Sequence, residues 1–201
     1  MATDEQQLFL FSVAEQKNLS YPRVKEKPAL ELDAESLQAW KVAIANHQQE
    51  VRSRPPEQQA TLFEGEQNSE HPKGNPDAID PFYLYLYNFF FFDLPANQHP
   101  SKPCLYFVID INVPLILYVG ETCKANQRWK GVHDCKRYVL NYRDLHARYG
   151  LSTAINTAFY WNVPAEVRPR QALELALILK WRSPFNKENW HYWGTPFIGE
   201  K

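Results

Sequence analysis

Two short apolar runs that lie close together in the sequence constrain the fold most. The first is CLYFVIDI, which ends at Ile111, and the second is LILYVG, which ends at Gly120. Aromatic and β-branched residues favour strands, and the intervening residues Asn112, Val113 and Pro114 are typical of a turn. The sequence therefore predicts a β-hairpin at the start of an α/β module.

The residues after this hairpin predict further elements of the same module. The polar stretch 124–148 carries spaced apolar residues, so we expect one or two short helices there, interrupted at Gly131 and near Asn141. Residues 153–163 are typical of a third strand, and the run RPRQALELALILKW predicts a central helix that is apolar on nearly all sides. The order ββα(α)βα indicates a small three-stranded antiparallel sheet flanked by helices.

Charge is distributed unevenly along the chain. Residues 1–100 hold 8 Lys and Arg against 15 Asp and Glu, a net charge of −7, whereas residues 101–187 hold 13 against 6, a net charge of +7. Clustered cations are what the neutralisation of phosphates needs, although a small domain can also carry such an excess by chance. A basic module behind an acidic leader is typical of a nucleic-acid-binding protein with a separate interaction arm.

The N-terminal part is predicted to be a partly disordered extension, residues 1–80. Its last part, residues 52–80, is rich in Pro, Glu, Gln, Asn and Gly, which is typical of a linker or a mobile loop. Before this linker, a segment that begins at Asp33 offers an N-cap followed by apolar residues at helical spacing. One helix near residues 34–51 is therefore expected inside the extension.

The folded domain is predicted to span residues 81–201, with its core at residues 103–187 and a short aromatic C-terminal tail. It opens with an aromatic stretch after Asp80 and Pro81. Asp-Pro is a helix-start signal, whereas Phe and Tyr favour strands, so the secondary structure stays open and only burial of the stretch is predicted.

Cysteine usage and hydropathy indicate the compartment. The three cysteines, Cys104, Cys123 and Cys135, form no CxxC pair. They argue against a disulfide framework and a closed zinc site, and they predict a reducing compartment. The longest apolar run, residues 82–92, falls short of the roughly 20 residues that a membrane span needs. We therefore expect a cytoplasmic protein without a membrane segment.

Several residues stand in an order that resembles the motifs of the GIY-YIG nucleases. They are Tyr106 in CLYFV, Tyr118 and Gly120 in YVG, Arg128 ten residues after Tyr118, Glu174 in the last predicted helix, and Asn186 twelve residues after Glu174. The resemblance covers residues 104–187, under half of the chain. It implies the fold of that family and a metal-dependent DNA endonuclease that acts in repair, recombination or defence against foreign DNA.

Glu174 is the candidate metal ligand. An ionised carboxylate in an otherwise apolar helix is costly unless it is paired or bound to a cation. The alternative is a pairing with Arg170, one helical turn earlier. As the only well-placed carboxylate, Glu174 implies a single Mg²⁺ or Mn²⁺ ion whose other ligands are water and phosphate oxygens.

The resemblance also implies roles for the other motif residues. Arg128 would hold the scissile phosphate, since a planar guanidinium is suited to it, unless it is a solvated arginine on a helix face. Tyr106 would lie near the attacking water and Tyr118 near the phosphate, unless both are packing residues of strands. Asn186 would fix a loop through hydrogen bonds from its side chain to the backbone. The predicted DNA contacts are the basic residues Lys124, Lys130, Lys136 and Arg137.

The sequence departs from the family pattern at two positions. Val132 stands where the family commonly has His or Tyr, and His133 joins the site only if Gly131 distorts the helix. Glu121 follows YVG, where some relatives carry a cation. The main alternative function is therefore a catalytically silent GIY-YIG-fold protein that binds DNA or is recruited to the bacterial DNA sliding clamp. A site-specific restriction enzyme is a third possibility.

A short segment of the acidic leader indicates a protein partner. Residues 7–11, QLFLF, are similar to the QLxLF peptides with which bacterial repair and replication proteins bind the DNA sliding clamp. Such peptides insert apolar anchors from a disordered tail, so the expected contacts are Gln7, Leu8, Leu10 and Phe11. Residues 59–63, QATLF, are a looser match, and either segment could instead pack on the nuclease core as a strand.

Overall fold

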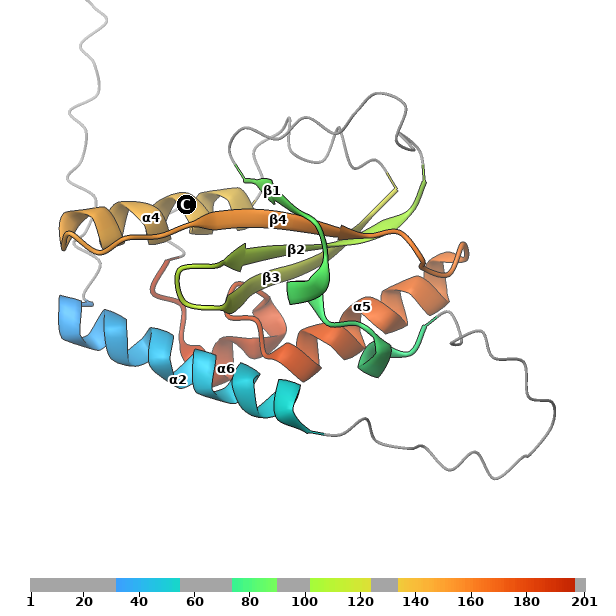
Figure 1. Cartoon of the computed structure of the whole chain (residues 1–201), viewed down its shortest axis with the longest axis horizontal. Helices are drawn as coiled ribbons and strands as arrows, with labels where there is room; N and C mark the ends of the chain where they lie inside the picture. Colours follow the sequence, from blue (N-terminus) through green and yellow to red (C-terminus); the bar gives the residue numbers. More distant parts are fainter. Residues whose placement is uncertain (1–31, 55–73, 90–101, 124–133, 198–201) are drawn as a thin grey trace, which may run out of the picture.

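The computed structural model describes residues 32–54, 74–89, 102–123 and 134–197, and Figure 1 shows how their elements are arranged. Within these ranges the strands form one antiparallel sheet, in the order β1-β4-β2-β3. The strands are β1 (Leu86–Asn88), β2 (Cys104–Asp110), β3 (Leu115–Thr122) and β4 (Ile155–Tyr160). The predicted α/β class is confirmed.

The helices surround this sheet. The longer ones are α2 (Ala34–Ser53), α4 (Asp134–Arg148) and α5 (Val167–Trp181), and the short ones are α6 (Trp190–Trp193) and the 3₁₀ helices η1 (Pro76–Ala78), η2 (Pro81–Tyr83) and η3 (Lys187–Asn189). Among the described residues, no helix combines the length and the apolar character that crossing a membrane requires.

The predicted hairpin is confirmed and consists of β2 and β3. Their register runs from Asp110 opposite Leu115 to Cys104 opposite Thr122, with one irregularity after Val108. β2 also pairs with β4, and it is buried over its whole length. One of the two inner strands of the sheet is therefore one of the two apolar runs that predicted the hairpin.

The sheet has one strand more than the three predicted. β1 lies at the edge of the sheet, paired with β4, and it falls in the aromatic stretch after Asp80. The helix-start signal of Asp-Pro and the strand preference of Phe and Tyr both operate, one after the other. The Asp80 carboxylate accepts a hydrogen bond from the Phe82 N–H at the start of η2, and the strand β1 follows. The prediction that the stretch is buried is wrong in part, since Tyr83 and Tyr85 are 85% and 75% exposed.

Two helices differ from their predictions. α4 continues through Asn141, where a break was expected, and the Asn141 side chain donates a hydrogen bond to the Phe197 carbonyl at 2.8 Å. α5 is not buried on all sides, because Leu175 and Leu179 are 45% and 51% exposed while Leu177 is buried. Its apolar residues therefore exceed what the contact with the sheet covers.

Separate hydrophobic cores form on the two faces of the sheet. Side chains alternate along a strand, so Leu105, Phe107 and Ile109 of β2 pack with α5, whereas Val108 packs with α4. The two helices consequently lie on opposite faces of the sheet (Figure 1).

α2, the helix predicted near residues 34–51, packs against the sheet and against α5. Leu37 and Ile44 are fully buried in the same core as α4. The Gln48 amide donates hydrogen bonds to the carbonyls of Ile116 at 3.0 Å and Trp181 at 2.9 Å, and it accepts one from the Ile116 N–H at 2.7 Å. This helix therefore shares its core with α4 and β3 and its hydrogen bonds with β3 and α5.

A buried polar cluster joins α2 and α4 to the hairpin. At its centre the fully buried Asp110 carboxylate accepts four hydrogen bonds, from Lys41 Nζ at 3.2 Å, the Tyr142 hydroxyl at 2.8 Å and the N–H groups of Asn112 at 3.1 Å and Ala154 at 3.0 Å. Burial, together with the Asp110 charge, raises the pKa of Tyr142 well above its ordinary value. The phenol thus stays protonated and keeps its role as a donor.

His146 makes the stability of this core depend on pH. It is buried, and burial lowers the pKa of its imidazole below the ordinary 6.5, with the neighbouring Lys41 charge acting in the same direction. Below about pH 6.5 the imidazole is protonated in the unfolded chain but stays neutral in the folded one. The free energy of unfolding is therefore expected to fall as the pH drops below about 6.5.

Urea unfolding of the wild type and of His146→Gln across this pH range measures the effect. The variant, which has no imidazole to protonate, is expected to lose less stability on acidification than the wild type. Identical losses in the two proteins would assign the pH dependence to other groups, such as His47, whose pKa is also lowered by burial.

Candidate active site

A groove with a volume of about 350 Å³ runs between β3, α5, the start of α4 and the loop that follows α5. Tyr118, Glu174 and Asn186, three of the predicted site residues, line it together. They come from three different elements, and Tyr118 and Asn186 are 68 positions apart in the sequence. The fold therefore brings distant motif residues to one place.

Asn186 fastens the loop after α5 to the outer edge of β3. Its Oδ1 accepts a hydrogen bond from the Val119 N–H at 2.9 Å, and its Nδ2 donates one to the Val119 carbonyl at 2.8 Å. The Ser183 hydroxyl donates a further bond to Oδ1 at 2.7 Å. These are the bonds from side chain to backbone that the sequence predicts for Asn186, and they take the place of another strand at this edge.

Glu174 is anchored to the end of β3. Its Oε1 accepts a hydrogen bond from the Glu121 N–H at 2.9 Å. The Glu121 carboxylate in turn pairs with Arg170, with 2.7 Å between Nε and Oε2. Arg170, which the sequence offers as a partner for Glu174, thus pairs with Glu121 instead.

The Arg170 side chain is buried and makes several further hydrogen bonds. It is 1% exposed, and it also donates hydrogen bonds to the carbonyls of residues 164–166 and to the Cys123 sulfur, the latter at 3.2 Å. A buried guanidinium is tolerated only when its donors are satisfied. Glu121, the departure from the family pattern, therefore has a structural role in positioning the end of β3.

The two motif tyrosines are diagonal neighbours on β2 and β3. Their ring centroids are 5.9 Å apart, and Tyr106 is fully buried whereas Tyr118 lines the groove. Tyr106 faces Gly120 on the neighbouring strand, and a β-carbon added at Gly120 would overlap its phenol ring. Tyr118 is therefore brought to the groove, and Tyr106 is not among the residues that line it.

Gly120→Ala is expected to lower the free energy of unfolding by about 1–3 kcal/mol, because the added methyl group overpacks the contact with Tyr106. Urea unfolding measures this loss. In a Tyr106→Leu background the ring is gone, so the same glycine replacement should be better tolerated. An equal loss in both backgrounds would show that the Tyr106 ring is not the obstacle.

Eight further residues line the groove that the sequence did not single out for this site: Asp134, Cys135 and Tyr138 of α4, Leu175 and Ile178 of α5, Phe185 before Asn186, and Lys187 and Glu188 after it. Lys187 Nζ lies 3.7 Å from Asp134 Oδ2, which links the loop after α5 to the start of α4. Lys187 and Glu188 could have been predicted from the sequence, because they directly follow the motif residue Asn186. Those of α4 could not, since their place depends on how that helix packs.

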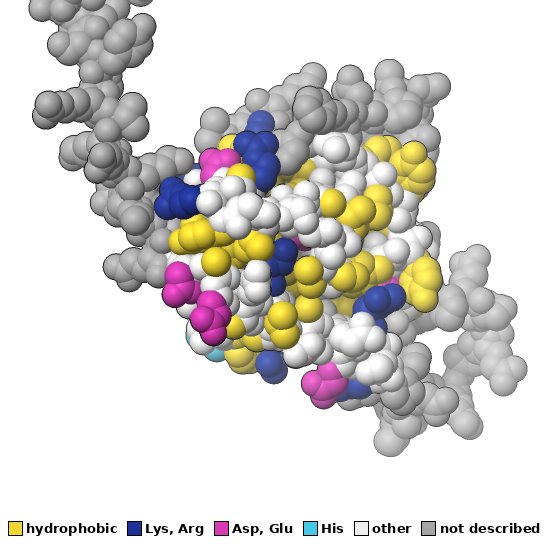
Figure 2. Space-filling view, turned by 60° about the vertical axis from the view of Figure 1, so that its left-hand side comes forward, with side chains coloured by type: hydrophobic (Ala, Val, Ile, Leu, Met, Phe, Trp, Pro, Cys, Tyr) yellow, Lys and Arg dark blue, Asp and Glu magenta, His cyan; other side chains and the backbone are white. Residues whose placement is uncertain are grey.

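Two of the predicted DNA contacts lie in the first turns of α4. Lys136 is half-buried, and Arg137 Nη2 donates a hydrogen bond to Asp134 at 3.0 Å, with its guanidinium over the Tyr138 ring. Figure 2 shows basic, acidic and apolar side chains intermixed on the face that it presents, without a patch of one sign. Outside the described residues lie Lys124, Arg128, Lys130, Val132, His133 and the segments 7–11 and 59–63.

A single carboxylate suits only certain ions. Among the residues that the structure describes, no three His, Cys, Asp or Glu side chains gather in a way that could hold a metal. Glu174 offers a hard oxygen donor at the groove, with Oε1 already fixed by the Glu121 N–H. Mg²⁺ and Mn²⁺ accept one carboxylate with water and phosphate oxygens as the remaining ligands, so the residues fit the predicted ion.

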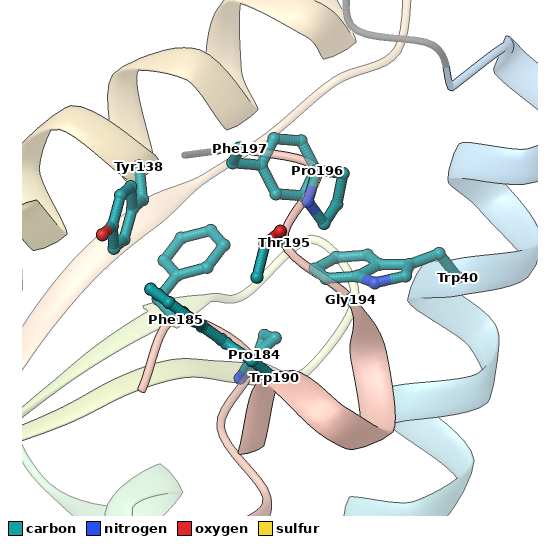
Figure 3. A pocket seen from close by; sticks show the side chains of 9 residues that line it. All are labelled: Trp40, Tyr138, Pro184, Phe185, Trp190, Gly194, Thr195, Pro196 and Phe197. Atoms are coloured by element: carbon teal, nitrogen blue, oxygen red, sulfur yellow. The ribbon is translucent and has the colours of Figure 1, made fainter. Parts of the chain in front are cut away.

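Two other hollows are explained by packing. The cavity in Figure 3 lies between α2, α4 and the aromatic C-terminal segment, and its volume of about 10 Å³ is that of roughly one water. Its walls include Trp40 and Phe197, whose ring centroids are 5.2 Å apart. The aromatic tail predicted from the sequence thus closes the core.

The third hollow is larger than the candidate site, at about 460 Å³, and lies where α2 and α5 end. Its cations include Arg52, which is 3.1 Å from Asp80, and Lys180, which is 3.0 Å from Asp77. Positive side chains at helix C-termini offset the helix dipoles. Arg54 pairs with Glu50 at 2.6 Å, and the Arg182 guanidinium lies over the Tyr192 ring, so each of these cations has a partner within the protein.

Comparison with known proteins adds no relative. No family model, no curated protein and no solved structure matches this chain. The likeness to GIY-YIG nucleases consequently rests on the motif residues themselves.

Proposed function

We propose that this chain is a metal-dependent DNA endonuclease of the GIY-YIG type that hydrolyses phosphodiester bonds. The observation that carries the proposal is the convergence of Tyr118, Glu174 and Asn186 on one groove. Each of the three belongs to the family motifs, and each reaches the groove from a different element. Packing alone does not require residues of these types to meet at an open surface.

The groove residues have distinct roles in this proposal. Glu174 holds one Mg²⁺ or Mn²⁺ ion, which when bound neutralises charge on the phosphoryl oxygens. The Tyr118 hydroxyl hydrogen-bonds to the scissile phosphate or to the attacking water. Tyr106, being fully buried, is a positioning residue whose ring packs against Tyr118. Arg128 completes the proposed site as the phosphate ligand.

DNA approaches this groove from the side of α4. Arg137 and Lys187 both contact the Asp134 carboxylate, at 3.0 Å and 3.7 Å. A phosphate of the DNA backbone can replace that carboxylate, because it accepts the same charge-assisted hydrogen bonds. Lys136 and Arg137 are therefore proposed backbone contacts, with Lys124 and Lys130 as further ones from the sequence.

The setting of the reaction follows from sequence alone. We propose action in repair, recombination or defence against foreign DNA, in the cytoplasm. Binding of the sliding clamp through Gln7, Leu8, Leu10 and Phe11 stays a prediction, as does the weaker candidate at residues 59–63.

A catalytically silent DNA-binding protein with this fold is the second candidate. The complete burial of Tyr106 favours it, because the tyrosine that family members place near the attacking water does not line the groove here. Val132, in place of His or Tyr, points the same way.

Cleavage of supercoiled, nicked and branched DNA by the purified full chain decides between the two. We expect cutting with Mg²⁺ or Mn²⁺, none with EDTA, and none by Glu174→Ala purified in parallel. Binding without cutting on every substrate would favour the silent module. Cutting by the Glu174→Ala protein at the wild-type rate would contradict the proposed role of Glu174 as the metal ligand.

A further inference from the structure

Tyr138 of α4 lines both the groove and the small cavity of Figure 3. Its ring packs edge-to-face on Phe185, with 6.0 Å between the centroids, and on Trp190, with 6.4 Å. These contacts fix the ring, and Figure 3 shows the hydroxyl pointing away from the cavity and its aromatic walls. The groove is the other hollow that Tyr138 lines, so the hydroxyl faces the groove.

The Tyr138 hydroxyl makes no hydrogen bond with any residue that the structure describes, although Tyr138 is only 3% exposed. It is also not one of the buried polar atoms that are cut off from water. Tyrosines buried to this extent usually pair their hydroxyl, as Tyr142 does with Asp110 at 2.8 Å. Phenylalanine would serve the packing equally well here, so the unused hydroxyl indicates a ligand.

Charged side chains lie one helical turn before this tyrosine. Asp134, Cys135 and Tyr138 share one face of α4, because residues three and four positions apart are neighbours on a helix. Helical side chains lean towards the preceding turn, which brings the phenol towards Asp134. The Asp134 carboxylate is paired there with two cations, at 3.0 Å from Arg137 Nη2 and 3.7 Å from Lys187 Nζ.

This place on α4 suits a phosphate oxygen. Arg137 Nε is buried and has no hydrogen-bond partner among the described residues, so one donor of the guanidinium is unused. The Asp134 side chain is 56% exposed, and ion pairs as exposed as this one contribute little to stability. A phosphate can therefore displace Asp134 at little cost. The other carboxylates of the groove, Glu174 and Glu188, come from α5 and η3.

We propose that the Tyr138 hydroxyl binds a phosphate of the DNA backbone, which takes the place of the Asp134 carboxylate beside Arg137 and Lys187. The hydroxyl donates a hydrogen bond to one phosphate oxygen, and the two cations bind the others. Asp134 then competes with DNA for these cations. The link to cleavage rests on the proposed nuclease function, whereas DNA binding tests the phosphate ligand alone.

Fluorescence anisotropy of the full chain with a labelled DNA duplex in EDTA measures binding without cleavage. Tyr138→Phe, which removes only the hydroxyl, is expected to weaken binding about tenfold. Because this variant keeps every cation, the dependence of its affinity on salt concentration should match that of the wild type. Asp134→Asn should bind DNA more tightly than the wild type, since it removes the competing charge.

Tyr192→Phe is the matched control, because Tyr192 is 46% exposed on α6 and does not line the groove. It should bind DNA like the wild type. Urea unfolding of Tyr138→Phe should also match the wild type, since its hydroxyl has no partner to lose. Unchanged DNA affinity of Tyr138→Phe, an equal fall in Tyr192→Phe, or a loss of stability in Tyr138→Phe would each overturn the proposal.

Cleavage assays separate this proposal from the nuclease function. Weaker binding by Tyr138→Phe, in a protein that cuts no DNA, would leave the phosphate ligand standing and remove the nuclease. Cutting that depends on Glu174, in a protein whose Tyr138→Phe variant binds DNA as tightly as the wild type, would leave the nuclease and remove the ligand. A wild type that binds no duplex would remove both.

Discussion

Glu174→Gln is expected to reduce DNA cleavage by about 10² to 10³-fold or more, the loss that follows when one electrostatic contributor to a transition state is removed. The glutamine retains an oxygen that can accept the Glu121 N–H, so the anchor at 2.9 Å is preserved. What disappears is the negative charge with which Glu174 would hold the proposed divalent ion. Urea unfolding is therefore expected to match the wild type while cleavage collapses.

Glu188→Gln provides the matched control for this result. Glu188 lines the same groove but is exposed and belongs to η3. Its neutralisation changes the charge of the groove equally and should leave cleavage close to the wild-type rate. Comparable losses in both variants would mean that the total charge of the groove matters and that Glu174 has no special place as a ligand. Unaltered cleavage by Glu174→Gln would exclude it as the metal ligand.

Asp110→Ala is expected to lower the free energy of unfolding by about 3–5 kcal/mol, the range for breaking a buried ion pair by removing one partner. Lys41 would be left as a buried cation, since its side chain is only 7% exposed. The Tyr142 hydroxyl and two backbone N–H groups would lose the same acceptor. Urea unfolding, followed by far-UV circular dichroism, measures the loss.

A double variant tests the cause of that loss. In Asp110→Ala with Lys41→Met the stranded cation is gone, so part of the lost stability should return. The exposed pair Arg143 and Asp144, on α4, offers a contrast, because Asp144→Ala should cost about 1 kcal/mol or less. No recovery in the double variant would show that the lost hydrogen bonds, and not the buried charge of Lys41, dominate.

The parts of the fold that sequence predicted are those with a local physical signal. The hairpin of β2 and β3 combines two apolar runs with a turn, and α5 and the Asp33-capped α2 combine helical spacing with clear ends. β1 was missed because a helix-start signal and strand-forming residues follow one another within a few positions. The break expected near Asn141 failed because its side chain is used in a contact with Phe197, far away in sequence.

In the candidate site, too, some features have a signal in the sequence and others depend on tertiary packing. Motif order grouped Tyr118, Glu174 and Asn186, and the fold places these three residues along one groove. Sequence could not show that Tyr106 is buried against Tyr118, since this depends on the pairing of β2 with β3 and on the space that Gly120 leaves. The partner of a buried charge is equally a matter of tertiary packing.

Gln48 has a consequence for how the protein can be divided. This one side chain of α2 serves both backbone groups of Ile116 and the last carbonyl of α5 at Trp181, all of them away from water. A fragment that starts at residue 81 would leave these groups without hydrogen bonds and expose the apolar surfaces beneath Leu37 and Ile44. Recombinant fragments meant to preserve the groove should therefore begin before Asp33.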